Sequence, residues 1–136
     1  MSGALVSRLL YRLLLFVCMA VLAPGLPAHH SVAGMFDMSK EIEWTGVISK
    51  IDWINPHTYI YLDVTDADGS TVTWQLSTAP TAMLRKAGLT KAMLMGDGAK
   101  VTITGLLARD GTKHLGWINK ISYPDGHFYQ FARSPR

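Results

Sequence analysis

Hydrophobic and polar residues alternate strictly in two neighbouring segments near the middle of the chain, residues 59–65 and 71–76. This alternation is typical of β-strands with one buried face. The residues between them, Asp66-Ala67-Asp68-Gly69, are of the types that favour tight turns. We therefore predict an antiparallel hairpin whose inward side chains are Ile60, Leu62, Val64, Val72, Trp74 and Leu76.

A longer strand is predicted before the hairpin, over residues 41–55. Its apolar residues change parity partway along, from Ile42, Trp44 and Ile48 to Val47, Ile51 and Trp53. A change of parity implies a bulge or a sharp bend, and Gly46 lies where the phase slips. A long, bent first strand that pairs on both sides is a device that closes small barrels.

After the hairpin the apolar residues no longer alternate with polar ones but recur at helical spacing, and this predicts one short helix. Ser77 or Thr78 can cap its start, Pro80 suits its first turn and Gly88 suits its end. Its buried side would consist of Met83, Leu84 and Ala87.

Further strands are predicted over residues 100–106 and 113–122, joined by an Asp110-Gly111 turn, with a terminal strand over 127–131. The resulting order is three strands, a short helix, and two or three strands. We therefore predict a mainly β fold, a small OB-like antiparallel β-barrel with one short helix between strands 3 and 4. A plain antiparallel sandwich is the alternative.

The first 28 residues have the pattern of a signal peptide that precedes this domain. Arg8 and Arg12 supply a positive region, residues 13–23 are apolar, and Ala28 is a small residue before a cleavage point. A membrane span needs roughly 20 apolar residues and this run is about half as long, which favours cleavage over an uncleaved anchor. We predict a signal peptide over 1–28, an N-terminal leader over 29–40 and the domain over 41–132, with a periplasmic location and no stable membrane anchor after cleavage.

Composition changes once the signal peptide is set aside. Cys18, the single cysteine, lies inside the apolar run, so the mature domain has no disulfide. The thirteen basic residues fall to eleven against ten acidic ones, which reduces the formal charge from +3 to +1. No basic patch is visible in the mature sequence, and this argues against nucleic acid as a partner.

Several short motifs recur together in a family known to us. They are His29-His30-Ser31, Phe36-Asp37, Trp53-Ile54-Asn55-Pro56-His57, the Asp68-Gly69 turn, and Gly96-Asp97 before a Val-Thr-Ile-Thr-Gly strand. With them the mature chain resembles a family of small secreted bacterial proteins of unknown function, which have a His-His-Ser mature N-terminus and an Asn-Pro-His motif. The resemblance implies a periplasmic location and an OB-like barrel, and it implies no activity.

Cleavage after Ala28 would make His29 the first residue, with a free α-amino group. The amine and the ring Nδ1 of His29 could then form one chelate ring on a metal ion, and His30 would add a second imidazole. All-nitrogen ligation favours Cu(II), with zinc as the other metal considered. A third nitrogen could come from His57. The opposing interpretation is that His29 and His30 belong to a flexible leader and that His57 is a turn residue.

A second hypothesis is a binding module without metal. In OB-folds the face of strands 2 and 3 is the usual binding surface. Tyr59 and Tyr61 would project outward from strand 2, with Trp53 close in sequence. Such aromatic side chains could hold a small solute, a saccharide or a periplasmic protein partner. The opposing interpretation is that these rings pack under the leader or the C-terminal segment.

Catalysis is the third hypothesis, and we predict that the protein is not an enzyme. The acidic residues Asp37, Asp52, Asp63 and Asp66 are scattered. The sequence contains no Gly-x-Ser-x-Gly, no phosphate-binding glycine loop and no His-Glu-x-x-His. We expect Met83, Met93 and Met95 to fill the core and not to bind copper(I).

Overall fold

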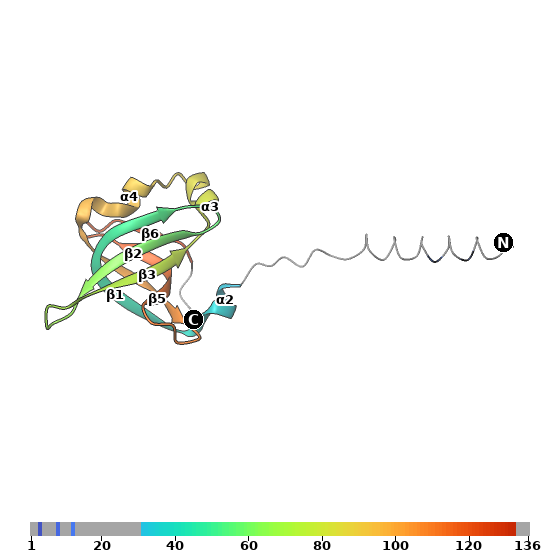
Figure 1. Cartoon of the computed structure of the whole chain (residues 1–136). Coiled ribbons are helices and arrows are strands. Elements are labelled where there is room, and N and C mark those ends of the chain that lie inside the picture. Colours follow the sequence, from blue (N-terminus) through green and yellow to red (C-terminus); the bar gives the residue numbers. More distant parts are fainter. Residues whose placement is uncertain (1–2, 4–7, 9–11, 13–30, 133–136) are drawn as a thin grey trace.

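The computed structural model describes residues 3, 8, 12 and 31–132 of the chain (Figure 1). The predicted signal peptide lies outside the described residues apart from three isolated positions, and His29 and His30 lie outside them too. In chain order the elements are α2 Val32–Met35, β1 Phe36–Trp53, β2 Thr58–Thr65, β3 Thr71–Thr78, α3 Thr81–Lys86, α4 Lys91–Met95, the 3₁₀ turn η1 Gly96–Gly98, β4 Lys100–Ala108, β5 Leu115–Ser122 and β6 Phe128–Gln130.

The six strands form one sheet in the order β3-β2-β1-β4-β5-β6, and all neighbours in this order are antiparallel. A short parallel pairing of β3 with β5, from Gln75–Leu115 to Ser77–Trp117, closes five of the strands into a ring. The prediction of a mainly β, antiparallel fold is confirmed. The strands belong to one closed sheet and not to the two separate sheets of the sandwich alternative.

Strand β1 is longer than predicted, because it begins at Phe36 and not at residue 41. It pairs with β4 up to Val47 and with β2 from Val47 onward, so a single strand borders both halves of the ring. The buried side chains of β1 do change from even to odd positions, as predicted, but they do so further along the strand than Gly46. The register shifts between Ile48 and Lys50, and Val47 is exposed, so the prediction of a phase slip at Gly46 is wrong.

Two short helices stand where one was predicted. Ser77 and Thr78 remain in β3 and do not cap a helix, and α3 begins after Pro80 without a side-chain cap. Gly88, with a φ of 80°, follows the end of α3, and the Thr90 hydroxyl then caps α4 by accepting a hydrogen bond from the Met93 N–H.

The interior of the ring is filled by side chains from every strand except β6, with α3 and α4 across one end (Figure 1). Leu84 from α3 and Leu94 from α4 join this core. By contrast, Met83 and Met93, predicted to fill the core, are 62% and 43% exposed, and Ala87, predicted on the buried side of the helix, is exposed. In the part of the chain that the structure describes, no helix is long and apolar enough to cross a membrane. The buried apolar core consists of Trp44, Ile48, Ile51, Ile60, Leu62, Leu76, Leu84, Leu94, Val101, Ile103, Ile118, Ile121 and Tyr123.

Candidate functional site

An open groove lies on the outer surface of the sheet, where the connection between β1 and β2 meets the faces of β2 and β3. Its volume is 320 Å³, near the lower end of small-molecule sites, which span ~300–1,000 Å³. We call it the Tyr59–Tyr61 groove. It is lined by Asp52, Ile54, Asn55, Pro56, His57, Tyr59, Tyr61 and Gln75.

Strand register brings these side chains to one face. Asp52 pairs with Tyr59 across β1 and β2, and Tyr61 pairs with Gln75 across β2 and β3. Side chains of directly opposed residues in an antiparallel pair point to the same side of the sheet. Because Ile60 and Leu62 point into the core, Tyr59 and Tyr61 must point outward, as the alternating pattern predicts.

A polar network fixes the Tyr61 side of the groove. The Tyr61 hydroxyl donates to Asp52 Oδ2 at 2.9 Å, and Lys50 Nζ lies 2.8 Å from Asp52 Oδ1. The same ammonium lies 4.8 Å from the centroid of the Tyr61 ring. Tyr61 is therefore held by its hydroxyl and by its ring face.

These contacts shift the titration of all three groups. Hydrogen bonding from Lys50 lowers the pKa of Asp52, with a further contribution from the Tyr61 hydroxyl. The hydrogen bond to Asp52 raises the pKa of Lys50. Burial, followed by the bond to Asp52, raises the pKa of Tyr61. At neutral pH the groove edge thus carries a paired carboxylate and ammonium beside a neutral phenol.

The connection between β1 and β2 forms one end of the groove. It contains a cis Asn55–Pro56 peptide bond and is tied to helix α3, because the Thr81 hydroxyl donates to the Ile54 carbonyl at 3.2 Å. His57 is exposed here, with its ring centroid 6.3 Å from that of Tyr59. On the other side of β3, the N–H of Gln75 donates to the His114 carbonyl at 2.8 Å, so the β4–β5 connection lies along the edge of β3.

Trp53 is not brought together with the two tyrosines. It pairs with Thr58, whose side chain is buried, and it packs against the core on the inner face of the sheet. Closeness in sequence suggested that it stands beside them, but a strand sends consecutive side chains to opposite faces. Sequence reasoning also missed Gln75, Asn55 and Asp52 as groove residues, although outward parity in the strands was a signal for Asp52 and Gln75.

The proposed metal ligands are only partly described. His57 lies at the groove, whereas His29 and His30 are outside the described residues. Among residues 31–132, no three His, Cys, Asp or Glu side chains are arranged to hold a metal ion.

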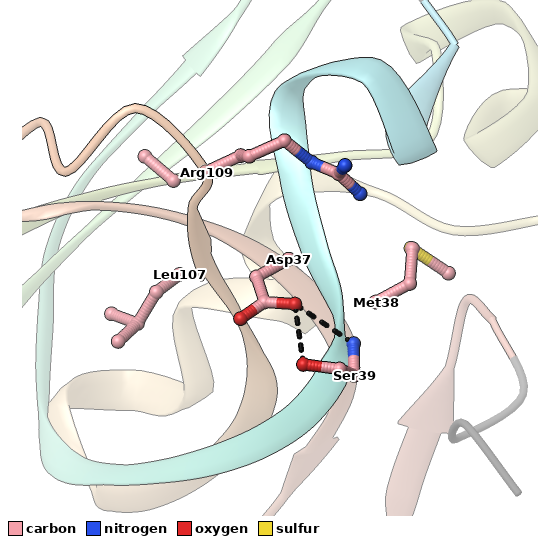
Figure 2. Close-up of a pocket in the computed structure, with 6 residues that line it drawn as sticks. Asp37, Met38, Ser39, Leu107 and Arg109 are labelled. Carbon is pink, nitrogen blue, oxygen red and sulfur yellow. Dashed lines mark hydrogen bonds between the residues drawn. The ribbon is translucent and has the colours of Figure 1, made fainter.

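A second depression, of 680 Å³, lies between the start of β1 and the end of β4 (Figure 2). Asp37 at its centre accepts hydrogen bonds from the Ser39 N–H at 2.9 Å and from the Ser39 hydroxyl at 2.7 Å. These bonds lower the pKa of Asp37, with a smaller contribution from Arg109. The Asp37 carboxylate is already bonded to Ser39, two residues along the chain, at the place where the register of β1 against β4 is irregular. We therefore attribute this depression to the irregular start of β1 and not to ligand binding.

The fold and the groove together place this protein in the class of small, mainly β domains that are built on a closed sheet and have an aromatic groove on the outer face. A model of the family of unknown function DUF6152 matches residues 15–117, and the chain belongs to that family. The predicted resemblance to a family of unknown function is thereby confirmed. No curated protein and no solved structure matches the chain significantly.

Proposed function

We propose that this protein is an exported periplasmic binding module, an OB-like barrel that holds a small polyhydroxylated solute such as a short oligosaccharide in the Tyr59–Tyr61 groove. The observation that carries the proposal is the pair of tyrosines on the outer face of β2, which line one open groove together with the polar side chains of Asn55, His57 and Gln75. The protein would bind and not catalyse.

The ring of strands supports the barrel class. Its order, β1-β2-β3-β5-β4, with the helices between β3 and β4 across one end, agrees with the OB-fold. In that fold the face of strands 2 and 3 and the neighbouring connections bind oligosaccharides and oligonucleotides. The groove occupies this face, the β1–β2 connection forms one end of it, and the β4–β5 connection lies along the neighbouring edge of β3.

The chemistry of the groove favours a neutral ligand with many hydroxyl groups. Tyr59 and Tyr61 offer flat apolar rings that carry a polar group. In the described structure, the side chains of Asn55, His57 and Gln75 make no hydrogen bond to other protein groups and are therefore available to a ligand. The nearby charge, Lys50, is neutralised by Asp52, so nothing at the groove favours a phosphate backbone.

The test is calorimetric titration of protein purified from the periplasm of an expression host with two probes, cellotetraose and chitotetraose. We expect one of these to bind, and Tyr59→Ala to weaken the affinity by about fivefold or more, since one stacked ring contributes ~1 kcal/mol or more. Thr73→Ala is the matched control, because Thr73 lies on the same outer face but does not line the groove.

Two outcomes would contradict the proposal: neither oligosaccharide binds, or Tyr59→Ala binds as well as the parent protein. A melting temperature measured for each variant separates loss of the site from loss of the fold. If Tyr59→Ala greatly lowers that temperature, the ring is part of the structure and not of a ligand site.

Metal binding at the N-terminus stays a separate prediction. Correctly processed protein should take up one equivalent of Cu(II) through His29 and His30, with or without His57. One extra residue before His29 moves the α-amino group out of chelate range, and the affinity should then fall. Equal binding by the extended protein would exclude an amine-based site.

A further inference from the structure

A further pocket, separate from the two depressions described above, is lined by residues from α4, η1, the connection between β5 and β6, and β6 itself. Its volume is 410 Å³, and the side chains that matter to its chemistry are those of Met93, Asp97, Tyr123, Asp125, His127 and Tyr129. We call it the Tyr123–His127 pocket. It shares no lining residue with the Tyr59–Tyr61 groove.

Tyr123 forms its rigid base. The ring is 6% exposed, and its hydroxyl donates to the Leu94 carbonyl at 2.9 Å. A Cβ on Gly96 would lie 2.6 Å from the Tyr123 ring, so the backbone of η1 approaches this ring as closely as a residue without a side chain permits. Burial raises the pKa of Tyr123, so the phenol stays neutral.

His127 is held on this base by three partners although it is exposed to solvent. Its ring stacks on Tyr123 at a centroid distance of 4.1 Å and an angle of 8°. The rings of His127 and Tyr129 meet edge to face, with their centroids 5.5 Å apart and their planes at 72°. Asp125 Oδ1 contacts His127 Nδ1 at 2.5 Å and also accepts the His127 N–H.

The contact with Asp125 selects the tautomer of the His127 imidazole. A carboxylate only accepts hydrogen bonds, so His127 must carry its proton on Nδ1. The hydrogen bonds from His127 lower the pKa of Asp125, which keeps that carboxylate ionised. In the neutral ring Nε2 is then an acceptor, in an orientation fixed by the stacking and by the carboxylate.

The Asp, Glu, Lys and Arg residues that line the pocket are all acidic. Its lining includes the carboxylates of Asp97 and Asp125 and no lysine or arginine. Carboxylates attract cations, and aromatic rings attract them at their faces but not at their edges. The exposed Met93 side chain adds an apolar wall. An anion or a neutral alcohol would lack the electrostatic part of this attraction.

We propose that the Tyr123–His127 pocket binds an organic ammonium group, donated as N–H to His127 Nε2 and to the Asp97 carboxylate. The probes are n-butylammonium, n-butanol and butyrate, which share one carbon chain and differ in charge. The readout is the change in backbone amide chemical shifts in NMR titrations of the whole protein. We expect butylammonium alone to give saturable shifts at residues 93–97 and 123–129.

Asp97→Asn tests the charge without altering the backbone, because asparagine tolerates the positive φ of 50° found at Asp97. This variant should bind butylammonium more weakly by up to about fivefold, since an exposed ion pair contributes up to ~1 kcal/mol. Asp66→Asn, in the β2–β3 turn, removes the same charge away from the pocket and should bind like the parent protein.

Equal shifts with butanol or butyrate, or undiminished binding by Asp97→Asn, would overturn this proposal. It stands independently of the oligosaccharide proposal. Tyr59→Ala should leave the butylammonium titration unchanged, and a loss of that titration in Tyr59→Ala would contradict the separation of the two sites.

Discussion

Glycine at position 46 is required where β1 passes from β4 to β2. The residue is buried, and a Cβ built on it would collide with the Asp63 carbonyl oxygen and approach the Leu62 side chain. Because the collision is with backbone, Gly46→Ala should lower the free energy of unfolding by about 1–3 kcal/mol, as overpacking of a core does.

Urea denaturation of the variant checks this value. Gly34→Ala is the matched control, because the nearest atom to a Cβ there belongs to a side chain, the Ser31 hydroxyl oxygen at 3.3 Å, and not to backbone. A Gly46→Ala protein as stable as the parent would contradict the close approach of these strands.

Asp52 shows how a groove residue titrates. Its pKa is lowered from 3.8, first by the hydrogen bond from Lys50. The stabilisation from this carboxylate is therefore present above its ordinary pKa and is lost as the pH falls through the lowered folded-state pKa. Lys50→Met should raise the pKa of Asp52, as followed by carbon-detected NMR of the carboxyl group.

Lys40→Met removes a similar charge elsewhere on β1 and should leave the Asp52 titration unchanged. If Lys50→Met also leaves it unchanged, the pairing of Lys50 with Asp52 does not hold in solution.

At the scale of elements, helix α4 depends on its cap. It is only five residues long, and the Thr90 hydroxyl accepts the Met93 N–H at 3.2 Å. Removing a capping hydroxyl costs ~1 kcal/mol. Thr90→Ala should therefore lower the unfolding free energy by about 1 kcal/mol, measured by chemical denaturation, whereas Thr90→Ser keeps the hydroxyl and should cost less. A loss in Thr90→Ser equal to that in Thr90→Ala would show that the cap does not matter.

Sequence alone predicted most elements, because alternation in β2 and β3 reports directly which side chains face the core. It failed where tertiary contacts decide. Nothing local indicates that Ser77 and Thr78 stay extended, since both pair with the start of β2, at Tyr59 and Thr58, and Ser77 pairs also with Trp117, forty residues further along. The bulge near Ser49 was placed too early because Val47 is apolar yet exposed.

The site was less predictable than the fold. Tyr59 and Tyr61 could be assigned to the outer face from parity. By contrast, the groove needs the β1–β2 connection to fold beside them, and this position depends on Thr81, which is distant in sequence. The Tyr123–His127 pocket had no sequence signal beyond a turn motif. Only the folded chain places His127 on Tyr123.

At the scale of the whole chain, we predict that the protein is exported and that its signal peptide is cleaved after Ala28. Protein isolated from the periplasm should have an intact mass that begins at His29, because cleavage after Ala28 removes the apolar run and the two arginines that precede it. Mass spectrometry of the native protein measures this directly. A mass that retains residues 1–28 would contradict export by a cleaved signal and would also remove the amine required for the copper prediction.

The central claim is that the outer face of β2 and β3 is a binding surface, and mapping of amide chemical shifts during titration with cellotetraose or chitotetraose tests it most directly. We predict that the shifts concentrate at residues 54–61 and at Gln75, and that Tyr59→Ala abolishes them. Shifts spread evenly over the domain, or located away from these residues, would contradict the claim.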